Sequence, residues 1–287
     1  MPGKNIKKEV SSMPGVYQMS IDNILEECKE LSLLNIPGII LFGIPEKKDP
    51  LGSEAYSDEG IIQKATQEIK QHYPNLLVMT DLCFCEYTSH GHCGIFENND
   101  VDNDKTLELV FKTAISQAKA GSDIIAPSLM MDNMVKTIRG ALDETGFSNT
   151  PICAYSAKYS SAFYGPFRQA ALSSPMQGDR KTYQMDPANS EEAMREIMLD
   201  LDEGADIVMI KPALSYLDII RRAKEEFNVP IAAYSVSGEY SMIKASAKNN
   251  WINEKQAVLE SHLSMKRAGA NFIITYFAKD LVNYLNE

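Results

Sequence analysis

Three of the five cysteines stand close together in residues 81–94, which read DLCFCEYTSHGHCG. Cys83 and Cys85 are two residues apart, so on extended chain their thiols point to the same side. A turn at Gly91 would return Cys93 to them. Three thiolates are strong ligands for Zn²⁺ and leave a fourth position for water or substrate, as in catalytic zinc sites. The spacing therefore predicts a catalytic metal site in this run.

Two histidines in the same run leave the ligand set open. His90 and His92 would serve either as ligands in place of a cysteine or as hydrogen-bond donors to a bound substrate. The other two cysteines, Cys28 and Cys153, stand apart and are predicted to be buried core residues. An odd number of clustered cysteines favours a metal site in a reducing compartment over a disulfide framework. We therefore expect a cytoplasmic protein.

Two lysines end apolar runs that have the character of buried strands. Lys211 closes the run IVMIK, and Lys158 closes the run ICAYSAK. An ammonium group above an apolar strand and beside another cation is destabilised, so its pKa falls and the free amine can attack a ketone. The ordinary alternative is a solvated lysine at a strand end. Two such lysines beside a thiolate metal site predict an enzyme that works through a Schiff base.

Candidate substrate-binding groups surround these lysines in the sequence. Residues 164–184 contain glycine, proline and serine and are predicted to form an active-site lid. Arg168 and Arg180 in this segment suit a carboxylate, which a planar guanidinium binds through two hydrogen bonds. Ser237 and Tyr276 end the last two predicted strands and are candidates for a second carboxylate. Surface exposure or turn formation is the alternative role for each of these four residues.

The elements that must position these residues are short apolar runs, each followed by a stretch of helical period. Continuous apolar strands separated by helices are typical of a parallel sheet that is buried on both faces. The predicted strands cover residues 38–43, 76–82, 123–128, 152–157, 207–212, 231–237 and 272–277. The predicted helices cover residues 59–73, 104–120, 133–145, 190–203, 217–227 and 253–268.

Several helix boundaries have recognisable signals. Ser20 and Asn189 are predicted to cap helix N-termini, because their side chains can accept a hydrogen bond from the first free N–H groups. Gly121, Gly204 and Gly269 each stand between a predicted helix and the next strand. A glycine at this position ends a helix in a left-handed conformation, so we expect positive φ angles at all three.

The strand count decides between two folds. Seven strand–helix units are predicted, whereas a closed (β/α)8 barrel needs eight. A doubly wound sheet can stay open, but no glycine-rich nucleotide-binding fingerprint follows the first predicted strand. We therefore expect residues 1–287 to form a single α/β domain, a (β/α)8 TIM-type barrel whose first strand is not in this sequence.

Composition excludes two classes of partner. The net charge of -11 and the scattered basic residues argue against nucleic-acid binding. No apolar run approaches the length that a membrane-spanning helix needs. The apolar fraction of 44% and charged fraction of 23% are those of an ordinary globular protein.

Taken together, these runs resemble the δ-aminolaevulinic acid dehydratase (porphobilinogen synthase) family from residue 12 to residue 276. The resemblance is most specific in residues 81–94, 155–158, 163–168, 178–184, 209–212 and 236–239. It implies a (β/α)8 barrel and a lyase that condenses two molecules of 5-aminolaevulinate to porphobilinogen, with loss of two waters, in haem biosynthesis. Family members also carry an N-terminal arm and a first barrel strand that this sequence is expected to lack. The arm contributes to an octamer, so the resemblance implies a homo-oligomer.

The resemblance also implies a role for each candidate residue. Lys211 would form the Schiff base with the substrate that becomes the propionate side, and Lys158 would hold the other substrate. Zn²⁺ on Cys83, Cys85 and Cys93 would act as a Lewis acid on that second substrate. The implied substrate-binding residues are Arg168, Arg180 and Gln184 for the second carboxylate, Ser237 and Tyr276 for the first, and Asp81 and Ser128 for the amino-group end.

One further metal ligand and two alternatives complete the expectations. Glu196 stands where many bacterial members of the family carry an allosteric Mg²⁺ ligand, although a solvated helix glutamate is an equal alternative. A class I aldolase-type lyase would share the barrel and the lysine without needing three thiolates. A catalytically impaired relative would instead serve as a zinc-binding or assembly partner.

Overall fold

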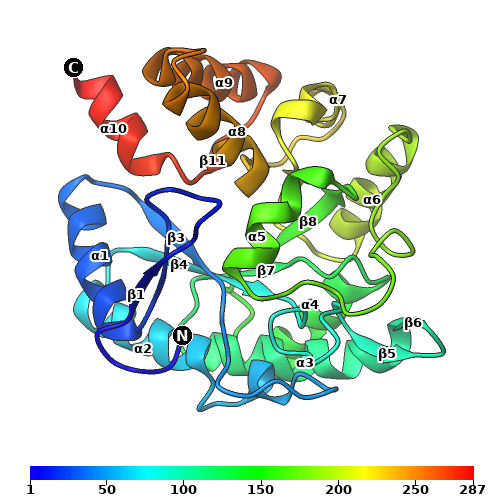
Figure 1. The fold of residues 1–287 in the computed structure, drawn as a ribbon. Coiled ribbons are helices and arrows are strands. Elements are labelled where there is room, and N and C mark those ends of the chain that lie inside the picture. Colours follow the sequence, from blue (N-terminus) through cyan, green and yellow to red (C-terminus); the bar gives the residue numbers. More distant parts are fainter.

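Parallel strands form the centre of the molecule in the computed structural model, which describes residues 1–287 (Figure 1). A three-stranded sheet contains β3 (Gly38–Leu41), β4 (Leu77–Leu82) and β7 (Ile124–Pro127). A four-stranded sheet contains β8 (Cys153–Lys158), β9 (Ile207–Lys211), β10 (Ile231–Tyr234) and β11 (Phe272–Ile274). A parallel bridge between Ile125 and Ile152 joins the two sheets. The strands therefore follow one another in chain order, as in a barrel.

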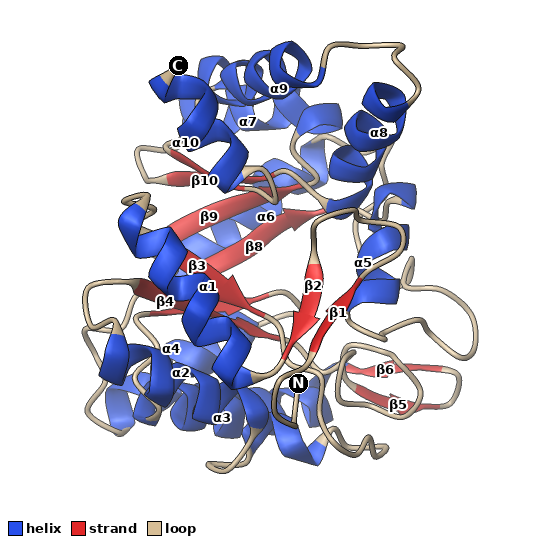
Figure 2. Ribbon diagram, turned by 60° about the vertical axis from the view of Figure 1, so that its left-hand side comes forward, coloured by secondary structure: helices blue, strands red, loops and turns tan.

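Helices pack around the outside of these strands (Figure 2). The helices are α1 (Ile21–Leu33), α2 (Ile61–His72), α3 (Asn103–Lys119), α4 (Met134–Glu144), α5 (Gly165–Ala170), α6 (Glu191–Asp202), α7 (Leu217–Glu226), α8 (Ser237–Lys248), α9 (Glu254–Ala268) and α10 (Ala278–Asn286). Short 3-10 helices cover Ser53–Tyr56, Ala162–Tyr164 and Leu214–Tyr216. The predicted α/β barrel class and the predicted parallel strands are confirmed. β3 and β11 are edge strands: each is hydrogen-bonded to one neighbouring strand, and they are not hydrogen-bonded to each other.

The strands are buried on both faces because their side chains alternate between two apolar environments. Met79, Met209 and Tyr155 belong to one cluster in the centre of the strands, whereas Val78 and Ile210 pack in clusters that include helix residues. This double burial explains why the strands have continuous apolar sequences. Cys28 and Cys153 are both buried, as expected of core residues. No helix of the structure is both long enough and apolar enough to span a bilayer.

The three predicted helix-ending glycines adopt the expected conformation. Gly121, Gly204 and Gly269 have φ angles of 95°, 106° and 132°. At the start of α6, the Asn189 side chain accepts hydrogen bonds from the N–H groups of Glu191 and Glu192, both at 3.1 Å. Asn189 therefore makes the predicted capping bonds, although the residue at the cap position itself is Ser190.

Ser20 occupies the cap position of α1 as predicted, but its hydroxyl makes no capping bond. It accepts instead from the N–H of Ile6 at 2.9 Å. That bond ties α1 to an antiparallel hairpin, β1 (Lys7–Glu9) and β2 (Tyr17–Met19), which the sequence pattern did not predict. A second unpredicted hairpin contains β5 (Ile95–Glu97) and β6 (Asp100–Asp102).

The last two predicted strands each end three residues earlier than expected, because a polar side chain turns the chain away from the strand. β10 ends at Tyr234, and the Glu239 carboxylate then accepts from the N–H of Val236 at 2.9 Å. Ser237 therefore begins α8 and does not end a strand. β11 ends at Ile274, and the hydroxyl of Thr275 accepts from the N–H of Phe277 at 3.1 Å. Ser237 therefore lies at the start of a helix and Tyr276 in a short connection, both beyond the C-terminal ends of the strands, where barrel active sites lie.

Candidate active site

Two buried lysines lie side by side at the C-terminal ends of β8 and β9. Lys158 and Lys211 are partners in the parallel register, and they are 5% and 6% exposed. Lys158 Nζ donates to the carbonyl oxygen of Ser128. Lys211 Nζ lies 4.2 Å from the ring centroid of Tyr234 and 4.9 Å from that of Tyr155. The structure thus brings the two predicted lysines together in a largely aromatic pocket.

This environment changes the proton affinity of Lys211. Burial, followed by the charge of Lys158, lowers its pKa to about 7, and Asp81 opposes the shift. A lysine with this pKa carries a free amine in about half of the molecules at neutral pH. An unprotonated amine is the form that attacks a carbonyl carbon. The geometry therefore supports Lys211 as a nucleophile.

A carboxyl group with an unused oxygen faces the same pocket. Asp81 near the end of β4 accepts a hydrogen bond from Ser128 Oγ at 3.2 Å through Oδ2, while its buried Oδ1 has no partner. Burial, followed by the charge of Glu86, raises the pKa of Asp81 to about 7. A buried polar atom without a partner is uncommon in folded proteins, so Oδ1 is a free acceptor that a substrate group could use. Asp81 and Ser128 thus offer a polar end to the lysine pocket.

The three clustered cysteines come together as predicted. The sulfur atoms of Cys83, Cys85 and Cys93 all lie within 4.8 Å of one another and are buried. The first two are 3.5 Å apart, close to the ~3.8 Å that separates two thiolates at Zn–S distances of about 2.3 Å in a tetrahedral site. The neighbouring side chains of Cys83 and Cys85 lower the pKa of Cys93. Soft sulfur donors at this spacing fit a metal ion.

A buried glutamate beside the cysteines was not predicted. Glu86 Oε2 accepts from Cys85 Sγ at 3.3 Å. Together with Asp81 and Cys83, it forms a second group of ligand atoms within 4.8 Å. Glu86 directly follows a candidate ligand, and that position in the motif is the signal that would have identified it. The site therefore contains a carboxylate that the sequence interpretation left without a role.

The histidine alternative for the metal ligands finds no support in the geometry. His92 Nδ1 lies 3.1 Å from the hydroxyl of Tyr183, and its Nε2 lies 3.0 Å from the carbonyl oxygen of Gln177. His90 Nε2 lies 3.1 Å from the carbonyl oxygen of Pro50. Neither histidine belongs to a group of potential metal ligands. His92 instead connects the cysteine run to residues 177–183 of the predicted lid.

The contact between the cysteine run and the predicted lid is tight. Arg180 Nη2 donates to the carbonyl oxygens of Gly91 at 2.8 Å and Ser173 at 2.5 Å. Gly91 has a φ angle of 74°, and a Cβ atom on it would lie 2.4 Å from the carbonyl oxygen of Ser174. Only glycine satisfies both conditions without strain. The segment therefore packs directly against the backbone between Cys85 and Cys93.

The three residues assigned to the second carboxylate share an unusual property. Each has a buried side-chain nitrogen without a hydrogen-bond partner: Arg168 Nε, Arg180 Nε and Gln184 Nε2. Burial, followed by the charge of Arg180, lowers the pKa of Arg168. Like charges held together with unused donors favour binding of an anion. Of the three, Arg180 lies beside the cysteine run, because its guanidinium also donates to the Gly91 carbonyl oxygen.

The remaining predicted residues are Ser237, Tyr276 and Glu196. Ser237 Oγ accepts from the N–H of Phe167 at 3.0 Å and donates to the carbonyl oxygen of Phe163 at 3.2 Å. The ring of Tyr276 lies 6.5 Å from that of Tyr234, which borders Lys211. Glu196 lies on α6, where burial and the charge of Asp132 raise its pKa, and it belongs to neither group of potential metal ligands.

A model of the delta-aminolevulinic (δ-aminolaevulinic) acid dehydratase family matches residues 1–284 of the chain. The chain belongs to this family. The dehydratase of Synechococcus elongatus is 62% identical over 99% of this chain and 89% of its own length. That of Bacillus subtilis is 59% identical over 98% of this chain and 87% of its own length.

A solved structure of the family has the same fold. It is the delta-aminolevulinic acid dehydratase (porphobilinogen synthase) from Toxoplasma gondii in complex with the reaction product porphobilinogen. The TM-score is 0.96 at 41% sequence identity, and the alignment covers 98% of this chain and 82% of the other. This likeness confirms the predicted barrel class, and the match to the family model confirms the predicted family.

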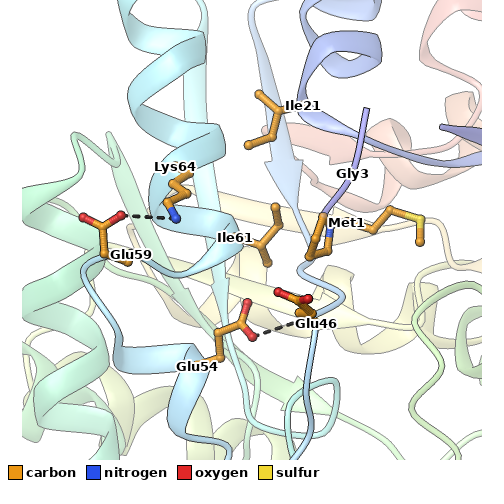
Figure 3. Close-up of a pocket in the computed structure, with 9 residues that line it drawn as sticks. Met1, Gly3, Ile21, Glu46, Glu54, Glu59, Ile61 and Lys64 are labelled. Atoms are coloured by element: carbon orange, nitrogen blue, oxygen red, sulfur yellow. Dashed lines mark hydrogen bonds and ion pairs between the residues drawn. The ribbon is translucent and has the colours of Figure 1, made fainter. Parts of the chain in front are cut away.

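A separate cavity lies apart from this dehydratase site. It has a volume of about 410 Å³ and is lined by residues from the N-terminus, the start of α1 and the region of α2 (Figure 3). Glu46, Glu54 and Glu59 contribute its carboxylates, and Lys64 pairs with Glu59 at 3.2 Å. None of the candidate residues lines this cavity, so it takes no part in the dehydratase site.

Proposed function

We propose that Lys211 and Lys158 carry out the reaction of this family, the condensation of two molecules of 5-aminolaevulinate to porphobilinogen with loss of two waters. Family membership supports the reaction. The observation that carries the assignment of the nucleophile is the buried Lys211 amine, whose pKa is lowered to about 7 beside a second lysine. A catalytically impaired relative would have no reason to keep this costly arrangement.

The chemistry at Lys211 follows from its free amine. The amine attacks the ketone carbon of the first substrate, and loss of water from the adduct leaves an iminium ion on Nζ. The iminium acidifies the neighbouring carbon, which can then form a bond to the second substrate. Lys158 holds that second substrate close by, so two ketones are fixed in a geometry suitable for reaction.

The carboxylates of the two substrates bind at different ends of the pocket. Arg168, Arg180 and Gln184 bind the carboxylate of the second substrate through their unpaired nitrogens. Ser237 and Tyr276 bind that of the first, and Ser237 exchanges its bond to the Phe163 carbonyl for one to the carboxylate. The unpaired oxygen of Asp81 and the Ser128 hydroxyl line the amino-group end.

Cys83, Cys85 and Cys93 are the proposed ligands of a zinc ion. When bound, Zn²⁺ supplies a Lewis acid near the carbonyl of the second substrate.

Glu196 remains a proposed ligand for an allosteric Mg²⁺ ion. The five free, buried cysteines support a cytoplasmic location. The family resemblance supports a homo-oligomer, and light scattering would test this oligomeric state.

Residues 164–184 are proposed to act as a lid over the site. Their contacts with His92 and Gly91 support this role, because these contacts hold the segment against the cysteine run. A closed lid excludes water and strengthens the electrostatic interactions inside. The lid also contains both arginines, so its closure and the binding of the second carboxylate are linked.

Replacing His92 with phenylalanine is expected to weaken the lid without removing the metal. The variant keeps the stacking on Phe96, where the ring centroids are 4.3 Å apart, but it loses both hydrogen bonds to the lid. We expect KM for 5-aminolaevulinate to rise by roughly tenfold, with unchanged zinc content per chain by atomic absorption. Loss of zinc would contradict the assignment of His92 and return it to the ligand set.

The proposed reaction is tested by incubating the zinc-loaded protein with 5-aminolaevulinate and detecting the pyrrole with a colour reagent. A class I aldolase-type lyase would not produce a pyrrole, and an impaired relative would bind zinc without turnover. No product from a folded, zinc-loaded sample would refute the proposed function. Product that is lost on chelation and restored by Zn²⁺ would support it.

A further inference from the structure

A buried histidine on α9 lies behind the turn that carries Tyr276. His262 is 5% exposed, and burial lowers its pKa, so the ring is neutral near pH 7. Its Nδ1 lies 2.7 Å from the carbonyl oxygen of Val258, and its Nε2 lies 2.8 Å from the hydroxyl of Thr275. None of the roles assigned above uses this residue.

The partners of His262 determine which ring nitrogen carries the proton. A carbonyl oxygen can only accept, so Nδ1 donates to Val258, and Nε2 of the neutral ring accepts from the hydroxyl of Thr275. The hydroxyl oxygen of Thr275 in turn accepts from the N–H of Phe277 at 3.1 Å. The hydrogen bonds therefore run in one direction, from Phe277 through Thr275 and His262 to Val258.

This chain of hydrogen bonds holds the residues on both sides of Tyr276. β11 ends at Ile274 and α10 begins at Ala278, so Tyr276 lies in the short connection between them. The ring of fully buried Phe277 packs edge-on against His262, with centroids 6.0 Å apart. A turn fixed at both neighbours leaves the Tyr276 side chain few alternative positions.

We propose that His262 is a positioning residue for Tyr276. As a hydrogen-bond acceptor, it fixes the turn through Thr275, and the turn presents the phenol to the carboxylate of the substrate on Lys211. The inference rests on the proposed function, which supplies the carboxylate role of Tyr276. Without the acceptor, the half-buried hydroxyl of Thr275 loses its partner and rotates toward another one, which frees the turn.

Trapping of the Schiff base with borohydride tests the inference at one site. Mass spectrometry of the Lys211 peptide gives the concentration of 5-aminolaevulinate that half-saturates this lysine alone. We expect His262→Leu to raise this concentration by roughly tenfold. His262→Gln keeps an acceptor for Thr275 and should stay within about threefold of the wild type. Thr275→Val should reproduce His262→Leu, and the double variant should be no worse than either single variant.

Met265→Ala is the matched control. Met265 is buried on the same helix as His262, but it packs in a different apolar cluster from Phe277, the neighbour of His262. This substitution should lower Tm and leave half-saturation at Lys211 unchanged. A lower Tm with unchanged half-saturation in His262→Leu would overturn the inference. If His262→Leu does not fold, Thr275→Val decides the same question.

Tyr276→Phe separates failure of the inference from failure of the proposed function. If the half-saturating concentration of 5-aminolaevulinate increases in Tyr276→Phe but not in His262→Leu, only the positioning role of His262 is wrong. An unchanged half-saturation in Tyr276→Phe means that the carboxylate role is wrong, and the inference falls with it. Parallel increases in both variants, with rescue by His262→Gln, support the positioning role.

Discussion

Replacing Lys211 with alanine is expected to lower kcat by on the order of 10⁴-fold or more, as removal of a covalent nucleophile does in other enzymes. Borohydride with substrate should add mass at Lys211 in the wild type and none at residue 211 in the variant. The pKa of Lys211 is lowered to about 7, so the fraction of free amine rises through neutrality. The wild-type kcat/KM should therefore increase as the pH rises through about 7.

Two control variants separate lost chemistry from lost structure. Lys119 is an exposed lysine in the last turn of α3, and Lys119→Ala should leave kcat unchanged. Lys211→Met keeps most of the side-chain volume and removes the buried amine. Because the ordinary pKa of lysine is 10.5, the unfolded wild type binds more protons than the folded state between about pH 7 and 10.5. Lys211→Met should thus be more stable than the wild type at pH 7 and below, with a difference that shrinks as the pH rises toward 10.5. An active Lys211→Ala variant would exclude Lys211 as the nucleophile.

Replacing Cys93 with serine is expected to weaken zinc binding by more than about 100-fold, which exceeds the 10–100-fold effect of losing an outer hydrogen-bond partner. Cys93 is one of three proposed thiolate ligands, so its loss removes a direct bond to the metal. Activity should fall in proportion to the zinc that is lost. Metal content after dialysis and the rate of pyrrole formation measure the two effects separately.

Chelation provides the reversible counterpart of this variant. The wild type should lose activity in the presence of a zinc chelator and regain it when Zn²⁺ is added, whereas Cys93→Ser should not recover at the same zinc concentration. Cys153→Ala is the matched control, because Cys153 is equally buried but lies among apolar residues. Full zinc content in Cys93→Ser would show that the ligands lie elsewhere, with Glu86 and Asp81 as the next candidates.

The parts of the site that depend on local sequence could be predicted. The spacing of Cys83, Cys85 and Cys93 and the strand-end position of Lys158 and Lys211 are local features. Because parallel strands bring their carboxyl ends to one edge, these features converge once the fold class is known. The helix-ending glycines are predictable for the same reason, since a single residue type satisfies the backbone requirement there.

The environment of these residues depends on contacts between distant segments. Tyr155 and Tyr234 surround Lys211 from neighbouring strands, and only the register of the barrel shows that their rings meet it. The bond between His92 and Tyr183 joins residues far apart in the chain, so the sequence left His92 open as a metal ligand. α8 was missed because its sequence, SGEYSMIKASAK, lacks a strong apolar stripe and follows directly after a strand.

Gly91 has a consequence for how sequences of this kind can diverge. A side chain here would collide with the backbone of Ser174, and its positive φ angle disfavours any other residue. A substitution at Gly91 is therefore tolerated only together with a compensating change in the segment around residue 174. The two positions should covary as one unit. Grafting a cysteine run from a relative would accordingly succeed only if the facing lid segment is transferred with it.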